Sequence, residues 1–137
     1  MLKKLCTLLL CFILLTACYW VNSVPVFASY SNSYHVSFSD YSNLNGIKTV
    51  KKLQYFLCLN KKGESCVVQD GITAEQILSD FNATIVRVEQ HCSGKSIYAY
   101  SSKIKYKKRV FNRIVNLHIE VSESGIRVGS PIIYGSF

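Results

Sequence analysis

The residues of this 137-residue chain whose types could do chemistry are few. His91 and Cys92 are adjacent in a short polar stretch that also holds Lys95, and a thiol with such neighbours is a candidate nucleophile. Nothing near them in the sequence supplies an orienting group or an oxyanion hole. The other histidines, His35 and His118, and the cysteines are too scattered to indicate a zinc site. We therefore expect no catalytic residue, no bound metal and no cofactor.

A cation-rich stretch is the second candidate. Residues 103–113, KIKYKKRVFNR, hold six Lys and Arg with Tyr106 and Phe111 between them. Cations interleaved with aromatic rings can hold the phosphates of an anionic polymer or lipid. A solvated connection between two strands has the same composition, so both interpretations stay open. The residues that would carry such binding are Lys105, Lys107, Lys108 and Arg109.

Four segments in the second half of the chain have strand-like patterns. They are ATIVRVEQ (83–90), SIYAYS (96–101), IVNLHIEV (114–121) and IRVGSPIIYGSF (126–137), and polar turns separate them. In the third segment, apolar and polar residues alternate, which predicts one core face and one polar face.

The polar face of this predicted sheet is the third candidate. If the strands pair in sequence order, the face is shared by Tyr98, Tyr100, Asn116, His118 and Glu120. Tyrosine rings interspersed with hydrogen-bonding groups suit a sugar or a peptide, because rigid rings lose little entropy on binding. The alternative is that another segment covers this face.

The element with the clearest sequence signal is a helix. Residues 71–81 form the best helix, since Thr73 and Gln76 make a capping box and Ile77 and Phe81 belong to an apolar stripe. One helix laid on the apolar face of a four-stranded antiparallel meander is the economical arrangement. The sequence therefore predicts an α+β fold, with a hairpin before the helix.

That hairpin is predicted around residues 61–63, where two apolar runs meet. A three-residue loop with Gly63 in the left-handed conformation sets Cys58 opposite Cys66. Directly opposed cysteines can form a disulfide. The alternative is a helix over residues 47–59, with the glycine beyond its end.

The N-terminal segment has the pattern of an export signal. Lys3 and Lys4 precede an apolar run over residues 5–21, which is typical of a secretory signal and is also long enough for a retained anchor. Leu-Thr-Ala-Cys at residues 15–18 matches a bacterial lipobox, so Cys18 is a candidate for lipidation. Cleavage after Ala28 is the competing site.

These signals divide the chain into three parts. Residues 1–28 are the signal, residues 29–46 are a linker or edge segment, and residues 47–137 are a single α+β domain large enough for one core. The net charge is +8, and a basic exported protein can bind anionic surfaces, although the charge is equally a routine aid to solubility.

The stretch from the predicted helix to the C-terminus, TAEQILSDFNATIVRVEQ, SIYAYSSKI, VNLHIEV and VGSPIIYGSF, resembles the YwmB family of exported Firmicute proteins. The motif-like parts are residues 98–101, 115–117 and 129–133. The resemblance implies export and a fold similar to that of the TATA-box-binding protein, in a short form with one repeat of a two-repeat design. It implies no chemistry, and likeness of fold to a DNA-binding protein predicts no nucleic-acid partner.

Together these patterns predict an extracytoplasmic, envelope-associated binding or accessory module without catalysis. The alternatives are a structural protein that pairs through its sheet face, with itself or another envelope protein, and a binder of anionic envelope polymers through residues 103–113. Attachment to the membrane is expected only through the signal or a lipid.

Overall fold

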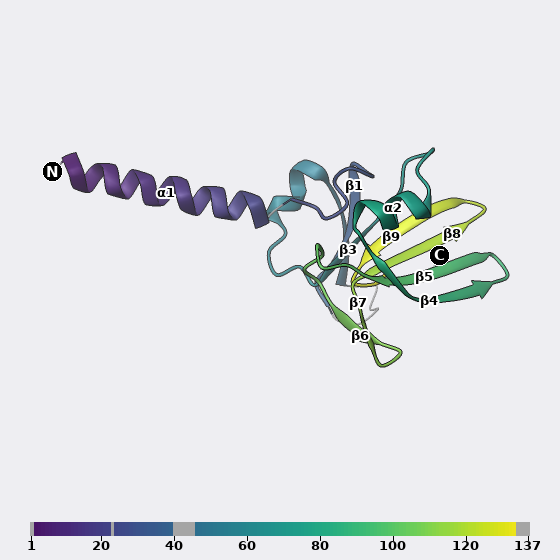
Figure 1. The fold of residues 1–137 in the computed structure, drawn as a ribbon. Helices are drawn as coiled ribbons and strands as arrows, with labels where there is room; N and C mark the ends of the chain where they lie inside the picture. The colour runs from purple at the N-terminus through teal and green to yellow at the C-terminus, as the bar shows by residue number, and fades with distance from the viewer. Residues whose placement is uncertain (1, 23, 40–45, 134–137) are drawn as a thin grey trace.

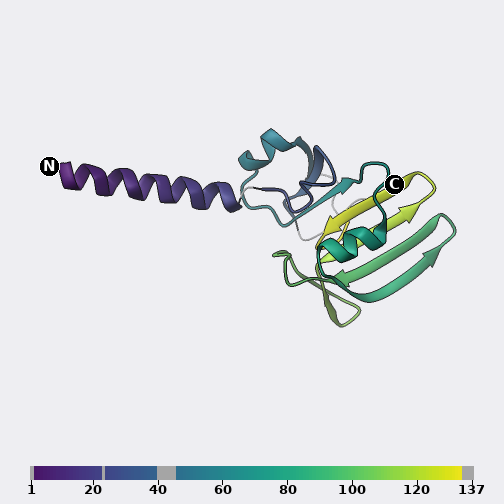
Figure 2. The ribbon, with the colours of Figure 1, turned by 45° about the horizontal axis from the view of Figure 1, so that its top comes forward.

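The computed structural model describes residues 2–22, 24–39 and 46–133 (Figure 1). Its first element is helix α1, Leu2–Asn22, which extends away from the rest of the chain in both views (Figures 1 and 2). Every α1 side chain whose burial is described is exposed, so the packed core begins after this helix. In the described part of the chain, no helix is long and apolar enough to span a membrane.

A seven-stranded antiparallel sheet forms the centre of the fold, so the predicted α+β class is confirmed. Its order is β2-β1-β3-β9-β8-β5-β4. The strands are β1 Ser33–Ser37, β2 Ile47–Lys51, β3 Gly63–Val67, β4 Thr84–His91, β5 Gly94–Tyr100, β8 Leu117–Ser122 and β9 Gly125–Ser130. A separate hairpin, β6 Lys108–Val110 and β7 Arg113–Val115, is inserted between β5 and β8.

The sheet is larger than the sequence predicted, because three strands from the first half of the chain join it. β1 lies between β2 and β3, although residues 29–46 were expected to be a linker or an edge segment. Part of the predicted linker, residues 40–45, lies outside the described residues, as do residues 134–137 of the last predicted strand. The strands β4, β5, β8 and β9 are neighbours in that order.

Helix α2, Ala74–Asp80, confirms the predicted helix within a few residues. The Thr73 hydroxyl accepts a hydrogen bond from the Gln76 N–H at 3.2 Å, as the capping signal predicted. Ala74 and Ile77 are buried against the sheet, and Figure 2 shows α2 lying over one side of it. This side is the core face.

The core also contains a segment that the sequence placed in the export signal. Phe27 is 0% exposed, and its ring packs edge-on against Phe81 with centroids 5.7 Å apart. Tyr30 joins the same cluster. The folded unit therefore begins near Pro25 and not at residue 29 or 47, because burial of these rings ties the segment to α2.

The predicted hairpin around residues 61–63 is wrong. Residues 52–57 form a 3-10 helix, η2 (Lys52–Leu57), and β3 pairs with β1 on one side and β9 on the other. Both edges of β3 are thus occupied by strands distant in sequence, and Cys58 is not across from Cys66. A single helix over residues 47–59 is not formed either, since β2 occupies its first turn.

Candidate functional site

The side of the sheet turned away from α2 is called the open face here. Its side chains alternate along each strand with those of the core face, so β5 contributes Ser96 and Tyr98 and β8 contributes His118 and Glu120. Ser96 and His118 are buried, and Tyr98 and Glu120 are half-buried. These residues are direct cross-strand neighbours, with Tyr98 opposite His118 and Ser96 opposite Glu120. The sequence predicted that Tyr98, His118 and Glu120 share one face, but it did not predict Ser96 there.

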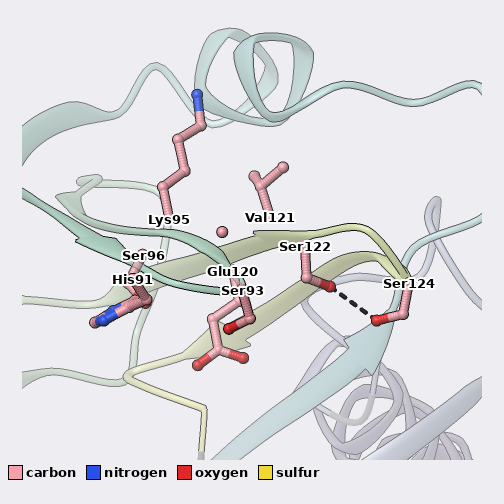
Figure 3. Close-up of a pocket in the computed structure, with 9 residues that line it drawn as sticks. His91, Ser93, Lys95, Ser96, Glu120, Val121, Ser122 and Ser124 are labelled. Atoms are coloured by element: carbon pink, nitrogen blue, oxygen red, sulfur yellow. Dashed lines mark hydrogen bonds between the residues drawn. The ribbon is translucent and has the colours of Figure 1, made fainter.

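A pocket of about 350 Å³ lies at the end of the sheet where the β4–β5 and β8–β9 turns meet (Figure 3). The residues that line it are His91, Ser93, Gly94, Lys95, Ser96, Glu120, Val121, Ser122 and Ser124. In Figure 3, Lys95 and Val121 point to the opposite side of the strands from Glu120.

Gly94 lets the two turns approach each other. Its φ is +147°, and a Cβ there would lie 1.9 Å from the Val121 carbonyl oxygen. Because this contact is with backbone that cannot move aside, a larger residue at this position would push the strands apart and distort the pocket.

His118 is held in one protonation state by its neighbours. Its ring stacks on Tyr98 with centroids 4.4 Å apart and planes 10° from parallel. The Ile133 N–H donates to His118 Nδ1 at 3.1 Å, so the proton of the neutral ring is on Nε2. Burial, followed by the nearby His91 and Arg127, lowers the pKa of His118 to about 4. The ring therefore offers one N–H donor at neutral pH.

Buried polar atoms of His118 and Glu120 on the open face lack hydrogen-bond partners among the described residues. They are His118 Nε2 and Glu120 Oε2, while Glu120 Oε1 lies 4.0 Å from His118 Nε2. Burial raises the pKa of Glu120, although Arg127 and His91 oppose that effect. Because unsatisfied buried groups each cost about 1–3 kcal/mol, a donor and an acceptor left side by side indicate a place where a ligand or solvent completes the bonding.

Ser96 and His91 have the residue types of a nucleophile and its base. Ser96 Oγ lies 3.1 Å from His91 Nε2. However, Ser96 is buried in the middle of β5, which pairs with β4 on one side and β8 on the other. Its surrounding backbone N–H groups belong to the sheet ladders and cannot form an oxyanion hole. The arrangement suits binding better than acyl transfer.

Asn116, predicted to share the polar face, is instead a buried structural residue. Its Oδ1 accepts from the Ser101 N–H at 2.7 Å, and its Nδ2 donates to the carbonyls of Ser101 (2.6 Å) and Ile104 (3.0 Å). The strand alternation fails here because β8 begins only at Leu117, after the inserted hairpin. Asn116 therefore holds residues 101–104 in place and is not available to a ligand.

The predicted basic residues lie on the loop before β6 and on the β6–β7 hairpin. Lys105, Lys107 and Arg109 are exposed, Lys108 is half-buried, and Lys107 Nζ lies 5.6 Å from the centre of the Tyr100 ring. Tyr100 is thus beside the basic hairpin, at the opposite end of β5 from the pocket.

The hairpin reaches the open face through its tip. Phe111 and Asn112 have φ values of 52° and 59°, which make the two-residue turn that suits a hairpin. The Phe111 ring packs edge-on against Tyr98 at 5.1 Å, and the Arg87 guanidinium lies 4.2 Å from its centre. Sequence reasoning missed Ser96 and Arg87. Ser96 could have been placed from its strand parity with Tyr98, but Arg87 is on β4 beside a register shift, and no local pattern places it opposite Tyr98.

The cysteines form no disulfide among the described residues. Cys58 and Cys66 are buried free thiols, and Cys92 is an exposed one. Burial raises the pKa of Cys66 to about 12. The Cys58–Cys66 disulfide was predicted from the hairpin register. Because that hairpin is not formed, the structure gives no support to this pairing. Cys18 lies in α1, and its side chain is outside the described part.

No group of three His, Cys, Asp or Glu residues in the described ranges could hold a metal ion.

Comparison with family models, curated proteins and solved structures gave no match to this chain. The fold and the pocket thus define an α+β domain with a ligand-sized site at the turn end of an antiparallel sheet.

Proposed function

We propose that this chain is an exported, envelope-associated binding domain without catalytic activity, and that its pocket takes a hydroxyl-bearing ligand such as a saccharide unit. The observation that carries this proposal is a pair of buried atoms without hydrogen-bond partners at the edge of the pocket: a carboxylate oxygen of Glu120, which lines the pocket, and the N–H of His118, which lies beside Glu120. A hydroxyl both accepts and donates hydrogen bonds, so a ligand rich in hydroxyls can satisfy both groups.

The rest of the pocket supports this ligand class. Four serines contribute hydroxyls, Ser93, Ser96, Ser122 and Ser124, and its volume of about 350 Å³ is at the small end of the range for small-molecule sites. Glu120 is the acidic member of the lining, and charge-assisted hydrogen bonds to a carboxylate are the stronger ones. Glu120 is therefore the residue on which affinity should depend most.

Export is supported by the character of α1. Its leucines are exposed along most of its length, and Lys3 and Lys4 lie at its start.

Of the two predicted processing sites, the packing of Phe27 in the core favours the lipobox at Cys18. Cleavage after Ala28 would remove Phe27, whose N–H donates to Glu64 at 3.2 Å and whose ring is fully buried. The resemblance to the YwmB family, which also implies export, stays a prediction.

Binding of anionic envelope polymers is a second candidate function. It is favoured by the exposed side chains of Lys105, Lys107 and Arg109 on the hairpin and the loop before it. The two functions do not exclude each other, because the exposed cations and the pocket lie at different places on the domain.

Titration of residues 24–137 with soluble saccharide fragments of bacterial envelope tests the pocket. We expect saturable binding by calorimetry, and a loss of about tenfold or more in affinity for Glu120→Gln, which removes the charge but keeps the shape. Glu75→Gln on α2, at the other side of the sheet, is the matched control and should bind normally. Equal affinity of the Glu120 variant, or binding of no fragment, would overturn the proposal.

A further inference from the structure

The segment Lys51–Lys62, KKLQYFLCLNKK, has a pattern of lysines and leucines that plays no part in the proposed ligand binding at the pocket. Lysine pairs stand at both ends, and leucines lie between them. Leu53 is 84% exposed, more than any other large apolar side chain described, and Leu57 and Leu59 are 67% and 63% exposed. Single exposed leucines are normal, but three within seven residues concentrate exposed apolar surface in one short segment.

The leucines are held outward by the residues between them. Tyr55 within η2 and Cys58 at its C-cap are buried, so this segment is held against the core at both positions. The Tyr55 hydroxyl donates to Glu64, and its ring packs against Tyr34 with centroids 5.8 Å apart. Since this anchor fixes η2, the leucines cannot turn inward.

Charge surrounds the same cluster. Lys51, Lys52 and Lys62 are exposed, while Lys61 Nζ donates to the Cys58 carbonyl at 2.6 Å and lies over the Tyr55 ring. Apolar side chains with cations on both sides are the pattern of an element that lies in the interface of an anionic bilayer.

The position of η2 is also consistent with contact with a bilayer. In both ribbon views, η2 lies beside the end of α1 nearest the sheet (Figures 1 and 2). α1 is itself an exposed apolar helix, so two apolar surfaces are presented at the same end of the molecule.

We propose that Lys51–Lys62 docks the domain on an anionic lipid bilayer. Leu53, Leu57 and Leu59 enter the boundary between headgroups and acyl chains, and Lys51, Lys52 and Lys62 pair with lipid phosphates. This contact is made by the domain itself, in addition to any attachment through α1 or a lipid. It does not depend on a ligand in the pocket.

Sedimentation of residues 24–137 with vesicles tests the proposal, because the described core lies wholly within this piece. We expect binding to vesicles of phosphatidylcholine with phosphatidylglycerol, and much weaker binding to phosphatidylcholine alone. Replacing Leu53, Leu57 and Leu59 together with Gln should weaken binding by about tenfold or more, because apolar burial in the interface is lost. A Trp at position 53 (Leu53→Trp) should show a blue-shifted emission on binding.

The matched control is Ile85→Gln with Val88→Gln, which removes exposed apolar side chains from the edge strand β4. It should bind vesicles as the parent does, and thermal melts should show all variants folded. Absence of binding by the parent, or equal binding by the leucine variant, would overturn the proposal. Leucine-dependent self-association without vesicle binding would also overturn it, since the occupant would then be a second copy.

Discussion

At the residue scale, Glu64 is the most informative side chain of the core. It is 1% exposed, its Oε1 accepts from the Phe27 N–H at 3.2 Å, and its Oε2 accepts from the Tyr55 hydroxyl. One carboxyl group thereby joins β3 to η2 and to the segment after α1. Burial raises its pKa to about 7, even though the hydrogen bonds it accepts oppose that change.

The first prediction concerns the pH dependence of stability. The folded-state pKa of Glu64 is raised from 4.5 to about 7, so its contribution is greatest at low pH and falls as the pH rises through this window. The pKa of His118 is lowered from 6.5 to about 4, so its contribution falls as the pH drops from 6.5 to 4. The two slopes oppose each other between pH 4.5 and 6.5.

Glu64→Gln should therefore remove the contribution to stability that falls as the pH rises, and leave the contribution of His118, which rises with pH. We expect its free energy of unfolding to rise with pH in that window relative to the parent, by up to about 1.4 kcal/mol per pH unit. Urea unfolding at several pH values measures the difference, in which the other titrating groups cancel. His118→Gln should change the slope in the other direction. Parallel profiles for parent and Glu64 variant would contradict the prediction.

The second prediction concerns Asn116, whose carboxamide satisfies three backbone groups of residues 101–104. Asn116→Ala should lower the free energy of unfolding by about 2–4 kcal/mol, because those buried groups lose their partners. Ser102→Ala, in the exposed part of the same loop, should change it by less than about 0.5 kcal/mol. Chemical denaturation compares the two, and a similar small effect in both would show that Asn116 is not the support of this loop.

At the element scale, the β6–β7 hairpin is separate from the main sheet, and its strands pair only with each other. Contact of Phe111 with Tyr98 and Arg87 fixes its orientation at the tip. Arg109 is therefore presented by an ordered element, with Lys105 and Lys107 exposed on the loop before it, and removing these cations should disturb little else.

The third prediction follows from this arrangement. Replacing Lys105, Lys107 and Arg109 with Ala should leave the melting temperature nearly unchanged, because exposed charges contribute little individually. It should abolish salt-sensitive binding to polyphosphate, which serves as the anionic probe. The control, Lys51, Lys52 and Lys62 replaced with Ala, removes the same charge from the η2 region. Equal losses in both variants would mean that net charge alone governs binding.

At the scale of the whole molecule, the sheet ends in two edge strands, β2 and β4, and β4 is the edge considered for pairing with a second copy. Ile85 and Val88 are about half exposed, which favours pairing. The register shifts between Ile85 and Arg87, however, and Arg87 forms an ion pair with Glu89 at 2.9 Å on the same strand. Bulges and charges of this kind protect edges from pairing.

The fourth prediction is that residues 24–137 are monomeric at micromolar concentration. Light scattering after size exclusion measures the mass directly. A dimer would instead favour the structural alternative, in which the protein pairs with a second copy. Val88→Lys should dissociate the dimer if it forms through the β4 edge, and should leave it intact if it forms through the sheet face.

The fifth prediction concerns processing. Protein recovered from bacterial membranes should have a lipid-modified Cys18 as its N-terminus, because this cleavage leaves Phe27 in the core. Intact-mass measurement distinguishes the products. A mature chain that starts at Ser29 would contradict the prediction, and its stability should then be far below that of residues 24–137, since a buried aromatic ring is worth about 3–5 kcal/mol.

The sequence by itself determined the local elements of this protein. The capping residues of α2 and the alternation in β5 and β8 are signals between neighbours in the chain, and they predicted the helix, the α+β class and the shared face of Tyr98 and His118. Only the tertiary structure decided which strands flank β3, that Asn116 turns inward and that Phe27 belongs to the core. Each of these depends on a partner far away in sequence, such as β9 for Cys66 or Glu64 for Phe27. Local patterns carry no information about such partners, because burial and pairing of distant segments are settled by how the whole core packs.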